Sequence, residues 1–147
     1  MKLDEIKALA KEKNYKLSED SAKLELQKLI DHYECDMDLI PEDGEDAAEQ
    51  VVNLLISAIR QGKLEIDDKN TDKGLSVIQH LKNGDSLVYR ELHGNDKTKI
   101  PDKMDAQMCL YTLAGILCGL GTDCVLKLPS SDLKVAAAIS GFFFIFC

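Results

Sequence analysis

The chain has 147 residues, of which 45% are hydrophobic and 30% charged, and its formal net charge is −8. This length and balance fit one globular domain, or one domain with a small helical extension, and argue against general disorder. The acidic balance argues against binding nucleic acid through its phosphates or adsorbing to anionic membranes, because no basic face is available.

The N-terminal part of the chain is predicted to be helical. Apolar residues recur at helical spacing over residues 3–13. Ser18 is expected to cap the next helix, because its hydroxyl can accept a free backbone N–H. A third helix is predicted over residues 45–61, with Gly62 as its C-terminal cap residue.

The hydrophobic period then changes from helical to alternating. This change predicts short strands over residues 63–67, 75–81 and 86–92. The pair Asn83-Gly84 lies between the last two strands and predicts a hairpin, since both residues can adopt positive φ. The polar segment after the last strand is expected to be a turn region.

Helices are predicted again in the C-terminal part. One helix is expected over residues 105–120 and a short helical turn over residues 122–128. The last helix is expected to begin with Ser130 or Ser131 as its N-cap. Asp132 would then lie near the positive end of the helix dipole.

This order of elements predicts an α+β fold that is mostly helical. An N-terminal helical segment, residues 1–62, would precede a domain over residues 63–147 in which a small β-hairpin or sheet is followed by C-terminal helices. The boundary is a shift in composition and not a linker, so the two parts are expected to pack together. Structural roles are assigned to four residues, namely Asn83, Gly84, Arg90 and Asp132.

The sequence contains no motif of a known catalytic class, such as Walker A, HExxH, GxSxG or GxGxxG. An enzyme or small-ligand binder would need a cleft that gathers Arg90 with His80 or His93 and the acidic loop. Arg90 itself is expected either to pair with Asp96 or Asp132 or to lie at the surface. We therefore expect no enzymatic activity and no cofactor.

Metal binding is also not expected. The acidic loop over residues 34–46 fails the EF-hand pattern, because Ile40 and Pro41 occupy positions that need an oxygen ligand and glycine. The five cysteines are an odd set without a CxxC pair, and their spacing does not suit zinc. Reduced, mostly buried thiols in a cytoplasm are the favoured interpretation.

The C-terminal helix carries the least usual composition in the chain. Its uncharged run from Val135 to Cys147 has thirteen residues, whereas a spanning helix needs about twenty. A membrane anchor is therefore disfavoured, and the charged N-terminus does not resemble a secretory signal.

This helix has two apolar sides, one of large residues and one that includes Ala136, Ala137, Ser140 and Gly141. One side is expected to fill the core, and an exposed remainder would be a partner-binding or self-association surface. The candidate partner-binding residues are Leu133, Val135, Ile139, Phe142, Phe143 and Phe146.

Several motifs follow one another in the C-terminal region: LVYREL at the end of a strand pair, HGND in a turn, LAGILCGL in a helix, then VLKLPSSDLKVAAAISGFF. This order resembles the tail assembly chaperones of long-tailed bacteriophages and their prophage relatives, over about the last seventy residues. The matching residues are Leu87, Arg90, Leu113, Ala114, Leu117, Gly119, Leu120, Val125, Leu128, Asp132, Val135, Ala138 and Phe142.

The resemblance implies a function without catalysis. The protein would bind the tape-measure protein or tail tube subunits in the cytoplasm of a host bacterium and keep them soluble until the tail polymerises. Residues 1–62 have no counterpart in that resemblance. The alternative is an unrelated bacterial protein-interaction or oligomeric adaptor module.

Overall fold

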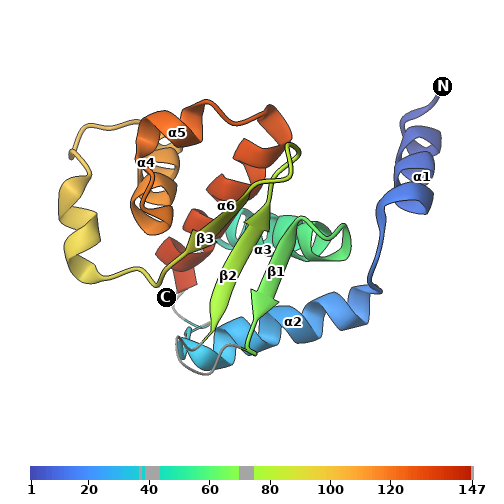
Figure 1. Ribbon diagram of the computed structural model, residues 1–147, viewed down its shortest axis with the longest axis horizontal. Coiled ribbons are helices and arrows are strands. Elements are labelled where there is room, and N and C mark those ends of the chain that lie inside the picture. Colours follow the sequence, from blue (N-terminus) through green and yellow to red (C-terminus); the bar gives the residue numbers. More distant parts are fainter. Residues whose placement is uncertain (37, 39–43, 70–74, 147) are drawn as a thin grey trace.

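The protein has an α+β fold that is mostly helical, as the sequence predicts. The computed structural model describes residues 1–36, 38, 44–69 and 75–146. A three-stranded antiparallel sheet in the order β1-β2-β3 lies against α3 and α6 (Figure 1). The elements are α1 (Leu3–Asn14), α2 (Glu19–His32), α3 (Glu45–Arg60), β1 (Leu64–Asp67), β2 (Ser76–His80), β3 (Ser86–Tyr89), η2 (Gly94–Lys99), α4 (Ala106–Cys118), α5 (Thr122–Leu126) and α6 (Ser130–Phe146).

The predicted N-terminal helices are confirmed. The hydroxyl of Ser18 accepts a hydrogen bond from the backbone N–H of Ser21 at 3.1 Å, so Ser18 caps α2 as expected. α1 is set apart from the rest of the molecule (Figure 1). The connection between the two helices is held at the end of α3, where the N–H groups of Lys16 and Leu17 donate to the carbonyl of Arg60 at 2.6 and 3.2 Å.

Gly62 ends α3 as the sequence predicts. It has a φ of 77°, a conformation that glycine adopts without a steric cost. Its N–H donates to Ile59 O at 3.1 Å, and the N–H of Lys63 donates to Ala58 O at 2.9 Å. These two bonds are those of a Schellman cap, and they turn the chain directly into β1.

The three predicted strands are present but shorter than expected. In each strand, successive side chains alternate between the face toward the helices and the face toward solvent, as the period of two requires. The alternation ends with β3 at Tyr89, so Leu92 is buried although the pattern places it beside the exposed Val88. The buried strand residues are Leu64, Ile66, Val77, Gln79, Leu87 and Tyr89.

The hairpin between β2 and β3 lies where it was predicted, but its turn is of another kind. Gly84 has a φ of 93°, whereas Asn83 does not adopt positive φ. Gly84 N donates to Leu81 O at 3.1 Å, and Leu81 N donates to Asp85 O at 2.8 Å. The loop therefore has three residues, with a left-handed glycine last, and Asn83 instead accepts Asp85 N on its side-chain oxygen at 2.9 Å.

Two further predictions need correction. The segment expected as a polar turn contains the 3₁₀ helix η2. α6 begins at Ser130, so Ser130 and Ser131 lie within its first turn and neither is the N-cap. The carbonyl of Pro129 accepts the N–H of Leu133 at 2.9 Å, so the helix starts one or two residues earlier than the serine signal suggests.

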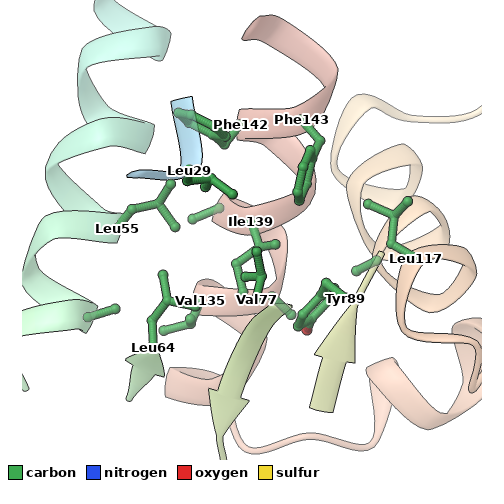
Figure 2. Packing of buried hydrophobic residues seen from close by; sticks show 14 of the residues in the cluster. Leu29, Leu55, Leu64, Val77, Tyr89, Leu117, Val135, Ile139, Phe142 and Phe143 are labelled. Carbon is green, nitrogen blue, oxygen red and sulfur yellow. The ribbon is translucent and has the colours of Figure 1, made fainter. Parts of the chain in front are cut away.

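α6 lies at the centre of the core. Figure 2 shows its large side chains among residues of α2, α3, the sheet and α4, so the buried cluster includes residues from both sides of Gly62. The backbone carbonyl of Phe146 accepts Asp36 N at 3.0 Å, which ties the end of α6 to the segment after α2. Within the described part of the chain, none of the helices combines the length and apolarity needed to cross a membrane.

Two helical glycines sit in contrasting surroundings. A Cβ on Gly115 of α4 would lie 2.5 Å from the backbone carbon of Gly121, because the chain returns across α4 at this point. Gly121 N donates to Gly115 O at 3.1 Å and fixes the contact. A Cβ on Gly141 of α6 would instead lie at ordinary contact distance, 3.5 Å from Val51 Cγ2 and 3.8 Å from Leu110 Cδ2.

We expect Gly115→Ala and Gly141→Ala to change stability in opposite directions. The first should lower the free energy of unfolding by about 1–3 kcal/mol, because backbone must move to admit the methyl group. The second should raise it by up to about 1 kcal/mol, since alanine is the better helix former. Thermal unfolding followed by circular dichroism measures both, and equal effects would contradict the two environments described.

Candidate functional site

The six residues predicted to bind a partner are placed by the structure mainly in the core. Leu133 is half-buried, and the other five side chains are buried in contact with the rest of the hydrophobic cluster. Figure 2 shows Ile139, Phe142 and Phe143 pointing among residues of the other elements. In this state of the protein the five are at most 5% exposed and offer little surface to a partner. They are Val135, Ile139, Phe142, Phe143 and Phe146.

The small-residue side of α6 is packed against α3 and α4, and of its four residues only Ala137 stays partly exposed. The hydroxyl of Ser140, which is fully buried, donates to Leu110 O at 2.9 Å and joins α6 to α4. Side chains from α3 and α4 approach each other over Gly141, where Val51 and Leu110 lie near the glycine Cα. Over the preceding turns of α6 the same helices leave a groove.

This groove, which we call the α3–α4–α6 groove, has a volume of about 310 Å³. Its floor is α6 at Ala137 and Ala138, and its walls are apolar side chains of α3 and α4 that are only partly buried. Such a surface, formed by three helices and left uncovered, suits another apolar helix. The apolar wall residues are Val51, Leu54, Leu110 and Tyr111.

Polar groups mark the ends of the groove. Gln107 donates to the hydroxyl of Tyr111 at 2.7 Å and holds that ring in the wall. An adjoining cavity of about 170 Å³ shares Leu54 and Lys134 with the groove. It also contains Ser131, whose hydroxyl is the one buried side-chain polar atom without a hydrogen-bond partner among the residues the structure describes.

Charges of both signs lie in and beside the groove. Of its described lining residues, Lys134 alone is charged. The turns of α3 that supply the groove residues Ala47 and Gln50 also carry the exposed carboxylates of Glu45, Asp46 and Glu49. Along the α3 edge, an apolar helix flanked by basic residues would match these carboxylates better than one flanked by acidic residues.

The walls of this groove were not among the residues predicted to bind a partner. Sequence reasoning singled out the phenylalanines because they are the largest apolar residues in α6. The residues that line the groove lie on the apolar stripes of α3 and α4, which also fill the core. Only the angle at which helices pack decides which part of such a stripe stays uncovered.

Arg90 pairs with Asp96, which is one of the two partners predicted for it. Its guanidinium donates to both carboxylate oxygens of Asp96 at 2.8 Å, while Asp96 also accepts the N–H of His93 at 2.8 Å. Asp96 is only 2% exposed. The Arg90 guanidinium and the His93 N–H hold the pKa of this carboxyl well below its usual range. The clamp fixes η2 to the end of β3.

Asp132, the other partner considered for Arg90, serves a different part of the fold. Its carboxylate accepts the N–H of Lys82 at 3.2 Å, and its carbonyl accepts the side chain of Gln79 at 2.8 Å. Gln79 in turn accepts the hydroxyl of Tyr89 at 2.6 Å, and burial raises the pKa of Tyr89. This buried chain of hydrogen bonds attaches the hairpin to the first turn of α6.

An enzymatic site would need a cleft that brings Arg90 together with His80 or His93. A cavity of about 370 Å³ brings Arg90 together with His32 and His93, so Arg90 is not isolated, although its guanidinium is engaged by Asp96. His80 lies elsewhere, between Glu65 at 2.9 Å and Ser86 at 3.1 Å. Among the described residues no group of three histidine, cysteine, aspartate or glutamate side chains could hold a metal ion.

Part of the acidic loop lies outside the described residues, including the EF-hand positions Ile40 and Pro41. Among the cysteines, burial raises the pKa of the half-buried Cys118 thiol, as expected for a thiol in apolar surroundings. Cys124 is exposed, which differs from that expectation. Cys35 is disulfide-bonded, which corrects the expectation that all the thiols are reduced.

Two adjacent phenylalanines provide a test of which part of α6 is core. Phe143 is fully buried, whereas Phe144 is 50% exposed beside the ammonium group of Lys97. Phe143→Ser should lower the free energy of unfolding by about 3–5 kcal/mol, because a large buried side chain is lost. Phe144→Ser should cost less than about 1 kcal/mol. Denaturant titration measures both, and a tolerated Phe143→Ser would show that this side chain is not core.

The Asp96 clamp predicts a pH-dependent contribution to stability. Asp96→Asn should lower the free energy of unfolding by about 2 kcal/mol at neutral pH, because charge-assisted hydrogen bonds are lost. The folded-state pKa is lowered, so the contribution is present above the unfolded value of about 3.9 and disappears as pH falls below it.

The measurement is denaturant unfolding of wild type and variant at a series of pH values, with Asp102→Asn at an exposed carboxylate as the control. The difference between wild type and Asp96→Asn should narrow toward acid pH. A difference that is independent of pH would mean that Asp96 does not act through its charge.

Known proteins do not help to assign a function to this site. A comparison of the sequence and the fold with protein-family models, curated proteins and solved structures finds no match. The α3–α4–α6 groove is therefore the feature of the chain that bears most directly on function.

Proposed function

We propose that this protein is a chaperone or adaptor without catalytic activity that binds tail proteins of a bacteriophage, either the tape-measure protein or tail tube subunits, during tail assembly. The observation that carries the proposal is the uncovered apolar groove between α3, α4 and α6. The resemblance of the C-terminal motifs to tail assembly chaperones names the class of partner.

The groove supports an α-helix as the element that is bound. An apolar stripe on a partner helix could lie along Ala137, whose small side chain lets another helix approach closely, between Val51 and Leu110. Each large apolar side chain removed from water there would contribute about 1.5–3 kcal/mol before the cost of association is subtracted. The bound segment is an amphipathic helix with lysine or arginine beside its apolar stripe.

The charge of the protein supports a chaperone role for the whole complex. A net charge of −8 on a chain of this size opposes self-aggregation through repulsion. A partner whose apolar helix is covered by such a body would gain the same protection. We place this activity in the cytoplasm of the host bacterium, with no cofactor and with neither nucleic acid nor membrane as partner.

One observation favours the second candidate function, an oligomeric adaptor module unrelated to phage tails. α1 carries exposed apolar side chains, so the protein has a surface for self-association besides the groove. The two candidates differ in the identity of the partner and share the groove as the binding site.

The proposal predicts that a substitution in the groove abolishes partner binding without unfolding the protein. The probes are synthetic peptides that tile a bacteriophage tape-measure protein. Ala137→Arg should weaken binding of the best peptide at least about tenfold, a loss of about 1.4 kcal/mol, because a long basic side chain fills the groove and repels a basic helix.

The matched control is Leu24→Arg, which puts the same charge on an exposed leucine of α2 and should leave binding unchanged. Titration followed by fluorescence anisotropy gives the affinities, and circular dichroism checks the fold. The proposal is wrong if no peptide binds the wild-type protein, or if Ala137→Arg binds as tightly as the control.

A further inference from the structure

α1 has an apolar stripe that stays about half exposed or more among the residues the structure describes. Leu3, Ile6 and Leu9 recur at a spacing of three residues and are 64%, 49% and 48% exposed. α1 has twelve residues, and isolated helices of about this length are marginal in water unless packing supports them. An amphipathic helix that stands apart from its own body is therefore an element that needs a partner surface.

The connection to α2 directs α1 away from its own groove. Arg60 holds the connection through both its backbone and its side chain. Its carbonyl accepts two N–H groups, and its guanidinium lies 3.8 Å from the ring centre of Tyr15. This anchor is on the side of α3 that faces α2, where Lys16 packs on Gly62. The groove opens on the other side of α3, toward α6, and α1 projects outward (Figure 1).

Charge favours contact between α1 and the body of another copy. Residues 1–16 contain five lysines and three acidic residues, whereas residues 17–147 contain 13 basic and 23 acidic residues. Lys2 and Lys7 lie four residues from Ile6 and Leu3, beside the apolar stripe. The exposed carboxylates near the groove are on the first turns of α3, so opposite charges would meet at its edge.

We infer that α1 of one copy binds in the α3–α4–α6 groove of a second copy, and that the exchange is reciprocal. Two α1 helices then fill two grooves around a twofold axis, which closes the assembly as a dimer. The α1 stripe and the apolar walls of the groove are buried by the same contact. This inference rests on the proposed function in one respect, since it assigns a second occupant to the same groove.

A dimer of this kind controls the access of partner helices to the groove. α1 of the neighbouring copy occupies it when no tail protein is present, which prevents unspecific association of the apolar walls. A partner helix that binds more tightly displaces α1, so partner binding and dimer formation exclude each other. The chemistry that recognises both occupants is the same: an apolar helical stripe flanked by basic residues.

The test is the mass of the full chain in solution, measured by sedimentation velocity over a concentration series. Wild type should sediment as a dimer at the upper concentrations. Ile6→Glu, which places a charge in the α1 stripe, and Ala137→Arg, which fills the groove, should each sediment as a monomer. Leu24→Glu, at an exposed leucine of α2, should remain a dimer.

Mixing the two monomeric variants provides the decisive measurement. Ile6→Glu keeps an intact groove and Ala137→Arg keeps an intact α1, so an equimolar mixture should recover dimer through one contact. No recovery on mixing, or an Ile6→Glu variant that remains a dimer, would overturn the inference. If Ala137→Arg fails to fold by circular dichroism, Gln50→Arg in the α3 wall takes its place.

Peptide binding separates this inference from the proposed function. Ile6→Glu should bind a tail-protein peptide at least as tightly as wild type, because a competitor for the groove is gone. If Ala137→Arg lost the dimer but kept peptide binding, the inference would stand and the groove would not be the site of the proposed function. If Ile6→Glu stayed a dimer while Ala137→Arg lost peptide binding, the reverse would hold.

Discussion

Burial of α6 is the constraint on which the rest of the structure depends. The helix is apolar on nearly all sides, so every side left in water carries a cost. α3, α4 and the sheet each cover one part of it, and the fully buried Ser140 hydroxyl finds an acceptor in the backbone of α4. The hydrogen bonds from Gln79 and Lys82 to Asp132 fix the start of the helix against the sheet.

The α3–α4–α6 groove follows from the same constraint. Small residues on one side of α6 allow α3 and α4 to pack closely on it, and the side chains of Val51 and Leu110 both lie near Gly141. Helices that cross at an angle separate again away from the point of closest approach. The turns of α6 near Ala137 are therefore covered less well, and the apolar walls on either side stay half-buried. The packing that completes the core near Gly141 therefore leaves a groove near Ala137.

Local signals in the sequence predicted local structure well. Ser18 caps α2 and Gly62 ends α3 because capping depends on one side chain or one φ angle and on backbone groups a few residues away. The same reasoning placed the hairpin at Asn83-Gly84 correctly but gave Asn83 the wrong conformation, and it misplaced the N-cap of α6. In both places the strand register or the packing of the helix selected among several turns that the residues permit.

The sequence by itself determined the mostly helical α+β class, the order of elements and the apolar character of the last helix, because periodicity and caps are properties of neighbouring residues. Tertiary structure alone decided that Arg90 pairs with Asp96 and not with Asp132, and that Phe143 is core while Phe144 is half exposed. It also decided where the groove lies and that α1 stands apart (Figure 1). These features depend on the angles and distances between elements far apart in the chain, which no local pattern encodes.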